Sequence, residues 1–477
     1  MKGGLNYWAW SYLRDLSRRA RSRRALRDKT THIVFLMCDH YEPRHKAENP
    51  GQEVERVSRW ERDYLAFFKE CINKYGHGPR HTWFYPPHHG IEHLAALNRL
   101  VLAGCGEIEL HLHHDNDNDA SFRRLMTGVI ADYQRRGILL TSGEKPHTAF
   151  SFIHGDWALD NSHPRGRYCG VDNEITLLQE FGCWGDFTMP SSNECQTKKI
   201  NSIYYAVDAP LARKSHDTGV DLKVGKKAPE NSFFMMQGPL GINLRAPRYP
   251  RIENASVTTG NWGRPDRIQA WLNSHIHVQD RPEWVFVKLH AHGAVEKDFD
   301  ALFGQRARAM HKMLNEVYND GKRYRLHYAT AREAYNICMA AEAGKDGDPS
   351  QFRDFRLAPY AHNFYHCSLP HQLHGVDKGY LNISGIGITA QAEKTNVVLA
   401  AGRLAGVNGR FSGVVWQDAG GRLELTGVEE GDLEITMRQA RIKVTRGAQL
   451  IREQDIEGGC LRYVLGPCSA SLEIEIA

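Results

Sequence analysis

The chain has 477 residues, of which 41% are hydrophobic and 25% are charged, an ordinary globular composition with enough length for two or three domains. The formal net charge is +5 at pH 7, but the excess is concentrated in residues 1–30, so a uniformly basic surface for nucleic acid is not indicated. The ten cysteines occur singly, without a C-x-x-C pair, which argues against a zinc ribbon and against a disulfide framework.

Residues 1–30 combine aromatic side chains with arginines, since Tyr7, Trp8 and Trp10 precede the stretch "RRARSRR". This make-up is typical of an interfacial helix, so peripheral membrane contact through residues 1–28 is one interpretation. A helix that packs its aromatic residues on the main domain and a flexible leader are the alternatives. The segment lacks the apolar core of a signal peptide, and no later segment reaches the roughly 18 apolar residues of a membrane span. We therefore expect a cytoplasmic protein, with contact at the inner face of the membrane as a further option.

From residue 31 to about residue 345, short β-like runs alternate with longer helical stretches. The β-like runs are residues 32–38, 81–86, 107–113, 148–154, 185–189, 201–207, 232–237, 283–290 and 324–329. The helical stretches are residues 53–75, 90–103, 120–136, 174–181, 265–274 and 298–319. This alternation predicts a mainly parallel α/β barrel over residues 31–345, although residues 150–260 are rich in loops.

The sequence changes character after residue 345. The stretch "AGKDGDPSQFRD" has the composition of a linker, which we assign to residues 346–375. From about Tyr380, short alternating runs such as "TNVVLAA" and "SLEIEIA" are separated by turn residues. Residues 376–477 are therefore predicted to form an all-β domain, most simply a small sandwich.

Polar side chains follow the first apolar run, "HIVFLMC". Asp39 and His40 come directly after it, and Glu42 lies two residues beyond His40. Adjacent aspartate and histidine can divide the work of hydrolysis, because one can accept a proton from water while the other holds a metal ion. The alternative is that Asp39 caps a loop.

The stretch "ELHLHHDNDND" carries three histidines and three aspartates at the end of a β-like run. His111 and His113 alternate with apolar residues, so both point to the same side of a strand. Turn-forming residues follow, which places these histidines at a strand end, where α/β folds usually build their active sites. Imidazole and carboxylate are common ligands of zinc, so we expect a metal site; the alternative is a solvated acidic turn with ordinary polar strand residues.

Two further segments end in polar residues. "FSFIHGDWALDNS" places His154, Asp156 and Trp157 after a β-like run, and a tryptophan beside hydrogen-bonding side chains suits a sugar; the alternative is a core tryptophan in a loop. "WVFVKLHAHGA" ends in His290 and His292, either of which could act as a general acid for a leaving group. The His-rich stretches 85–93 and 362–374 show no clear strand-end placement, and we expect supporting or interdomain roles for them.

The order of these segments resembles the polysaccharide deacetylases of the NodB-homology type, within the glycoside hydrolase/deacetylase barrel group. The resemblance covers about residues 31–340 and implies a distorted (β/α) barrel of seven or eight units. In the family, the first strand ends in T-F-D-D, whose first Asp is the catalytic base and whose second Asp binds the metal. Here "MCDH" occupies that place, so the resemblance implies that Asp39 is the base and that His40 replaces the metal-binding Asp.

The second family motif, H-S/T-x-x-H, follows an E-I run like "EIELHLHHD". It implies His111 as the first ligand and Asp115 as the second, whereas strand alternation favours His111 with His113, and both partners stay open. The last family motif ends in Leu-His, which "KLHAHG" matches with His290 as the residue that protonates the leaving group. The chain departs from the family in lacking an R-x-P-x-G motif and in having D-H for D-D.

The resemblance implies a metal-dependent hydrolase of amide (C–N) bonds that removes the acetyl group from an acetylated amino sugar. A divalent ion, with zinc as the first choice, would bind water and the acetamido carbonyl, while Asp39 removes the proton of the water and His290 protonates the amine. His154, Asp156, Trp157 and His292 would contact the substrate, which could be a glycan, a sugar nucleotide or a lipid-linked precursor. A glycoside hydrolase with paired carboxylates and a catalytically inactive carbohydrate-binding protein are the alternatives.

Overall fold

The computed structural model describes residues 5–26, 29–90, 93–135, 138–141, 147–191, 193–209, 211–247, 249–362, 378–384, 387–393, 404–408, 413–417, 422–426, 433–438, 440–456, 460–466 and 471–476. The chain divides into two compact units, the first formed by Met1–Val129 with Thr148–Ala358 and the second by Ile130–His147 with Pro359–Ala477. The expected linker therefore straddles this division, because its residues up to Ala358 belong to the first unit. The His-rich stretch 362–374 lies, after His362, outside the described residues.

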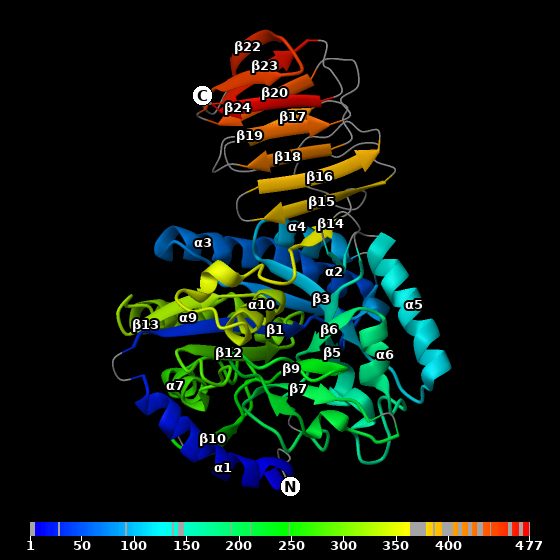
Figure 1. Ribbon diagram of the computed structural model, residues 1–477, viewed down its shortest axis with the longest axis vertical. Coiled ribbons are helices and arrows are strands. Elements are labelled where there is room, and N and C mark those ends of the chain that lie inside the picture. The colour runs from blue at the N-terminus through cyan, green and yellow to red at the C-terminus, as the bar shows by residue number, and fades with distance from the viewer. Residues whose placement is uncertain are drawn as a thin grey trace. The chain divides into compact units, whose positions relative to one another are not determined.

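The first unit is built on a ten-stranded sheet with the order β12-β1-β2-β3-β5-β6-β9-β7-β8, and β13 pairs with β1 as well (Figure 1). The strands are β1 (Thr31–His40), β2 (His81–Tyr85), β3 (Gly106–Leu112), β5 (Phe150–His154), β6 (Cys183–Asp186), β7 (Ile203–Val207), β8 (Val220–Asp221), β9 (Ser232–Met236), β12 (Trp284–Ala291) and β13 (Tyr324–Tyr328). Every pair from β12 to β9 is parallel, and only β7 and β8 run antiparallel to their neighbours. The mainly parallel α/β sheet predicted from the sequence is confirmed.

The two ends of this strand order are joined by the segment Ile276–Gln279. On one side Gln279 exchanges backbone hydrogen bonds with Leu222 and Val224, which follow β8. On the other side the Phe286 N–H of β12 donates to the Ile276 carbonyl at 2.8 Å. The sheet thus curls back on itself, as in a barrel with one irregular side.

Ten α-helices accompany the strands in the described residues, of which α5 continues from the first unit into the second: α1 (Leu5–Arg24), α2 (Pro50–Arg59), α3 (Leu65–Tyr75), α4 (Leu94–Leu102), α5 (Asp119–Arg135), α6 (Glu174–Glu180), α7 (Pro265–Ser274), α8 (Phe299–Leu302), α9 (Gln305–Val317) and α10 (Ala331–Glu342). Local signals explain their starts. Asn49 caps α2 by accepting a hydrogen bond from the Gln52 N–H, and Pro50 stands in the first turn. Thr330 and Glu333 form a capping box at the start of α10.

Two helical expectations differ from the structure. The stretch 298–319 is broken at Gly304, where a Cβ would meet the Asp300 side chain and backbone, and the Asp300 carboxylate accepts from the Gln305 N–H as α9 begins. The helix α10 was not predicted. All its residues except Tyr335 are buried, so it lacks the alternating polar and apolar faces that identify a surface helix.

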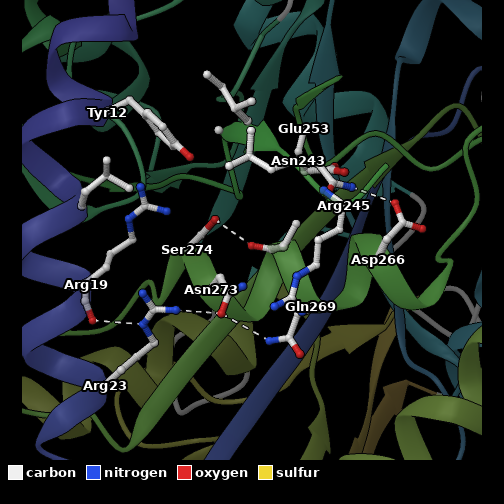
Figure 2. Close-up of a pocket in the computed structure, with 15 residues that line it drawn as sticks. Tyr12, Arg19, Arg23, Asn243, Arg245, Glu253, Asp266, Gln269, Asn273 and Ser274 are labelled. Carbon is white, nitrogen blue, oxygen red and sulfur yellow. Dashed lines mark hydrogen bonds between the residues drawn. The ribbon is translucent and has the colours of Figure 1, made fainter. Parts of the chain in front are cut away.

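The helix α1 lies against the first unit. Trp8 is fully buried, in a small core with Ile200 and Leu240. Figure 2 shows the pocket beside the helix, where Tyr12 and Arg19 face the segment that carries Asn243. The burial of Trp8 and two hydrogen bonds to Asn201 attach the helix to the rest of the unit: Arg18 donates to the Asn201 carbonyl at 3.0 Å, and the Asn201 side-chain amide donates to Asp15 at 3.2 Å.

No helix in the described ranges is both long and apolar enough to span a membrane.

The second unit contains two antiparallel sheets, in keeping with the β-rich character predicted for residues 376–477. One sheet has the order β21-β24-β19-β18-β16-β15-β14-β4 and the other β17-β20-β23-β22. The strands are β4 (Leu140–Thr141), β14 (Tyr360–His362), β15 (Lys378–Ser384), β16 (Gly387–Glu393), β17 (Leu404–Asn408), β18 (Gly413–Gln417), β19 (Arg422–Thr426), β20 (Leu433–Arg438), β21 (Ile442–Arg446), β22 (Leu450–Ile456), β23 (Cys460–Leu465) and β24 (Ser471–Ile476). Alternate residues such as Leu423 and Leu425 are buried, in keeping with the period-two pattern of the sequence. The sandwich arrangement stays a prediction.

Candidate metal centre

The histidines singled out at three strand ends come together in the structure. The strands β1, β3 and β12 are parallel members of one sheet, so their carboxyl ends share an edge. The His40 ring centroid lies 4.9 Å from that of His111, 6.0 Å from that of His290 and 5.0 Å from that of His292. Residues separated by about 250 positions in the sequence thus form a single group of imidazoles.

Glu42 is the centre of this group. Its Oε1 lies 3.0 Å from His113 Nε2 and 3.8 Å from His111 Nε2, while its Oε2 lies 3.9 Å from His292 Nε2. We call His40, Glu42, His111, His113 and His292 the Glu42 cluster. The carboxylate and three imidazole nitrogens converge on one small region, which is the donor set expected for zinc or a similar ion.

Hydrogen bonds fix the orientation of two of these rings. His111 Nδ1 donates to the Ile153 carbonyl at 2.7 Å, and His113 Nδ1 lies 3.2 Å from Asp156 Oδ2. These acceptors hold a ring hydrogen on each Nδ1 and direct both Nε2 atoms, 3.1 Å apart, toward the Glu42 carboxylate. Orienting partners of this kind are typical of metal-binding histidines.

His40 adds a third imidazole to the cluster. Its Nε2 is buried, and nothing in the described part of the chain hydrogen-bonds to it. Burial lowers the pKa of His40 well below its ordinary value, and the neighbouring histidines lower it further. The ring is therefore neutral, and its lone pair is available for a metal ion.

The charges in the cluster reinforce one another. Burial alone would raise the pKa of Glu42, but the hydrogen bonds and charges of His111 and His113 outweigh it and lower that pKa. Burial would likewise lower the pKa of His113, but hydrogen bonds to Asp156 and Glu42 raise it to about 9. Without a metal ion, the cluster therefore holds a carboxylate against a protonated imidazole, and a metal cation could replace that proton.

Asp39 lies beside the cluster, and both of its carboxylate oxygens have hydrogen-bond partners. Its Oδ1 accepts from the Gly293 N–H at 2.5 Å, and its Oδ2 lies 2.8 Å from His81 Nε2. A Cβ at Gly293 would overlap Asp39 Oδ2, so only glycine fits this turn. Trp60 Nε1 donates to the Gly293 carbonyl at 2.6 Å. These contacts make Asp39 an anchor of the turn that follows His292.

The structure gives Asp115 different partners from those expected of a metal ligand. Asp115 is exposed, and its Oδ1 accepts from the backbone N–H groups of Asn116 and Tyr168 at 2.9 and 2.7 Å. It therefore stabilises a loop and is not brought to the Glu42 cluster, whereas His113 is.

His154, Asp156 and Trp157, expected to contact substrate, take separate places. Asp156 orients His113, as described above. The Trp157 ring is half-buried, 5.8 Å from the His40 ring. His154 is fully buried and belongs to a second group, where its Nε2 lies 3.0 Å from His114 Nε2 and 3.4 Å from Glu174 Oε1.

The backbone that presents Trp157 is strained. Asp156 and Trp157 have φ values of 51° and 58°, in the left-handed region that bulky side chains rarely adopt. Such strain concentrates at functional sites, where the surrounding structure holds it in place. Here it directs the indole toward His40 and the Asp156 carboxylate toward His113.

Sequence reasoning noted Glu42 but gave it no role. His40 and Glu42 are two residues apart, so the alternation used for His111 and His113 could have placed them on one side of the chain. His88, from the His-rich stretch 85–93, lies beside the cluster as well, with its ring 5.7 Å from that of His113. His114 belongs to the His-rich stretch singled out in the sequence as a candidate for the metal site, but nothing local pairs it with Glu174, because that contact arises only from the fold.

No protein-family model matches the sequence, and no curated protein sequence matches it. Among solved structures, the chain resembles a protein from Parabacteroides distasonis described as a "putative glycoside hydrolase/deacetylase". The likeness covers 83% of this chain and 82% of that protein, with 10% identity and a TM-score of 0.35. At these values the likeness supports no inference about activity.

Proposed function

We propose that this protein is a metal-dependent hydrolase that removes the acetyl group from an acetylated amino sugar. The observation that carries the proposal is the convergence of His111 Nε2 and His113 Nε2 on the Glu42 carboxylate, at the carboxyl edge of a parallel sheet. Parallel α/β folds place their chemistry at this edge. We further propose that the fold is a distorted barrel of the deacetylase type, as the family resemblance of the sequence implies.

The donor set of the Glu42 cluster fits a divalent ion. Imidazole nitrogens and one carboxylate suit zinc, the Nδ1 atoms of His111 and His113 are held by other partners, and His40 Nε2 is buried without one. Glu42, His111 and His113 would hold the ion, with His40 or His292 as a further ligand. When bound, the ion would supply Lewis-acid activation of water and of the acetamido oxygen.

Proton transfer is assigned to His290 and His292. Burial lowers the pKa of both rings, and the Lys288 charge lowers that of His290 further. Both are therefore neutral, and His290 accepts the proton of the attacking water and returns it to the departing amine. The His292 side chain is 33% exposed, so it can exchange protons with solvent. Asp39, expected as the base, receives a positioning role because both of its oxygens already accept hydrogen bonds.

Trp157 supports a sugar as the substrate. Its half-buried ring stands next to His40, and an apolar sugar face can stack on an indole. The cluster is also reachable, since 33% of the His113 side chain and 46% of the Asp156 side chain are exposed. The acetylated sugar could belong to a glycan, a sugar nucleotide or a lipid-linked precursor.

The test combines metal analysis with acetate release from oligomers of N-acetylglucosamine. We expect bound zinc or a similar ion and acetate release in the wild type, and in His111→Ala the loss of acetate release and of the metal held by the Glu42 cluster. His77→Ala is the matched control, because His77 contacts Asn315 of α9 and lies outside the Glu42 cluster. A wild-type protein without metal, even after incubation with zinc, would overturn the proposal. Release of reducing ends without acetate would favour a glycoside hydrolase instead.

A further inference from the structure

A second group of metal-capable side chains lies beside the Glu42 cluster without sharing a residue with it. It consists of His114, His154, Cys169 and Glu174, which we call the Glu174 cluster. His114 follows β3, His154 ends β5, Cys169 lies in the next loop and Glu174 begins α6. The side chains of His154 and Glu174 are 0% exposed and that of His114 is 2% exposed, so the cluster is closed to solvent.

The four donor atoms are close enough to share one ion. His114 Nε2 lies 3.0 Å from both His154 Nε2 and Glu174 Oε1, and Cys169 Sγ lies 3.4 Å from Glu174 Oε2. One donor atom of each residue falls within 4.8 Å of the others. Two imidazoles, a thiol and a carboxylate are a donor set that zinc accepts, and four protein ligands complete its tetrahedral coordination.

The ring orientations leave a gap that a cation would fill. His154 Nδ1 donates to the Gly155 carbonyl at 2.6 Å, and His114 Nδ1 lies 3.0 Å from Asp117 Oδ2. With the hydrogens held on Nδ1, the two Nε2 atoms face each other at 3.0 Å with their lone pairs. This contact is repulsive unless a metal ion or an extra proton lies between the rings and Glu174.

We propose that the Glu174 cluster is a second metal site, a closed zinc site with a structural role. Four protein ligands leave no position for substrate, in contrast to the Glu42 cluster, whose side chains are partly exposed. The adjacent residues His113 and His114 belong to different clusters, so the end of β3 connects them.

The proposed ion would brace the loop that serves the Glu42 cluster. The residues from His154 to Glu174 run from the end of β5 to the start of α6, and both ends of this segment are ligands. Asp156 and Trp157 lie within it in their strained conformation. A bound ion would therefore help hold these two residues against His113 and His40.

Binding releases two protons, the thiol proton of Cys169 and the extra proton that the metal-free cluster holds between the two rings and Glu174. Burial and the Glu174 charge raise the pKa of the Cys169 thiol, so this group is neutral until an ion arrives. Zinc binding forms the sulfur–zinc bond and releases the thiol proton to the buffer, with no change of oxidation state.

The test is spectroscopic and does not depend on activity. We expect two equivalents of zinc in the wild type, and X-ray absorption should show sulfur at about 2.3 Å from part of the zinc. Replacement of zinc by cobalt(II) should produce a thiolate-to-cobalt charge-transfer band in the near ultraviolet. Cys169→Ser should lose that band and about one equivalent of metal, whereas Cys195→Ser, which changes another buried cysteine, should keep both.

The outcomes separate this site from the proposed active site. His111→Ala should lose acetate release and the metal ion of the Glu42 cluster, which has no sulfur ligand. It should keep the thiolate-to-cobalt band of the Glu174 cluster. If the wild type binds zinc or cobalt without any sulfur ligand, the inference is wrong. The Glu174 cluster then holds an extra proton in place of a metal ion. Because the absorption measurement uses the wild type, failure of Cys169→Ser to fold would not affect it.

Discussion

The state of single residues in the Glu42 cluster depends on competition between protons and metal. His113 has a pKa of about 9, because hydrogen bonds to Asp156 and Glu42 outweigh the lowering effect of burial. In the metal-free protein this ring is therefore protonated at neutral pH. Metal binding at His113 Nε2 removes that proton, so affinity must rise with pH until His113 is already neutral.

We predict that the dissociation constant for zinc falls about tenfold per pH unit between roughly pH 7 and 9 and then levels off. Asp156→Asn removes one carboxylate partner of His113 and so lowers the pKa of this ring. The dissociation constant should then stop falling at a lower pH than in the wild type. Competition titrations with a chelator across this range measure both effects. Asp115→Asn is the matched control, because the Asp115 carboxylate accepts hydrogen bonds from the loop N–H groups of Asn116 and Tyr168. A larger dissociation constant for zinc in that variant would show that Asp115 is a metal ligand after all.

Gly293 illustrates how one residue maintains the site. A Cβ here would overlap Asp39 Oδ2 and crowd the Trp60 ring. We predict that Gly293→Ala lowers the free energy of unfolding by about 1–3 kcal/mol, the usual cost of overpacking a core, and weakens metal binding because His292 shifts. Gly260→Ala is the control, since a Cβ at Gly260 meets nothing within 4 Å. Urea unfolding compares the two, and equal stabilities would show that Asp39 does not fix this turn.

At the scale of elements, the helix α1 has two tryptophans with opposite environments. Trp8 is fully buried, whereas Trp10 is 67% exposed and Leu13 is 57% exposed. We predict that Trp8→Ala destabilises the protein by roughly 3–5 kcal/mol, and that Trp10→Ala changes the free energy of unfolding by less than about 0.5 kcal/mol. Thermal unfolding of the two variants measures the difference.

The same pair tests peripheral membrane contact, which stays a proposal. Trp10 lies on one face of α1 with the exposed residues Arg14 and Arg21, a combination that favours anionic lipid surfaces. Sedimentation with vesicles containing phosphatidylserine should then carry down the wild type and less of Trp10→Ala. Equal sedimentation of both proteins would count against the contact.

Strands and helices could be predicted from the sequence where polar and apolar residues alternate with a regular local period. His111 and His113 follow strand alternation, and the parallel order of β1, β3 and β12 brings His40 and His290 to the same edge. The sequence-based prediction failed for α10, which is buried nearly all round, and for residues 298–319, where Gly304 interrupts the helix. The strands β1, β3 and β12 are buried on both faces but were recognisable as short apolar or alternating runs, whereas a helix buried nearly all round has no polar face to reveal its period.

The Glu174 cluster marks a different limit of sequence reasoning. Its ligands come from four segments, and Cys169 stands alone in the sequence, so no spacing identifies it. His154 was placed correctly at a strand end, but its partner His114 depends on the pairing of β3 with β5. Side chains that meet only through tertiary contacts have no local signature.

At the scale of the whole molecule, both clusters belong to one of the two compact units. Glu42 and Glu174 lie within Met1–Val129 and Thr148–Ala358, whereas the antiparallel strands from β14 onward belong to the other unit. An ion that binds only the folded form stabilises it by mass action. Metal should therefore stabilise the first unit and leave the intrinsic stability of the second unchanged.

We predict that calorimetry resolves two thermal transitions, of which only one responds to metal. Free zinc at about 100 times its dissociation constant contributes roughly 2.7 kcal/mol per site, which corresponds to a shift of several degrees. A chelator should lower that transition and zinc should restore it, whereas magnesium, which prefers oxygen ligands, should not. In His111→Ala part of the zinc response should remain, because the Glu174 cluster is intact. A response that disappears completely in this variant would mean that the protein holds a single metal site, at the Glu42 cluster.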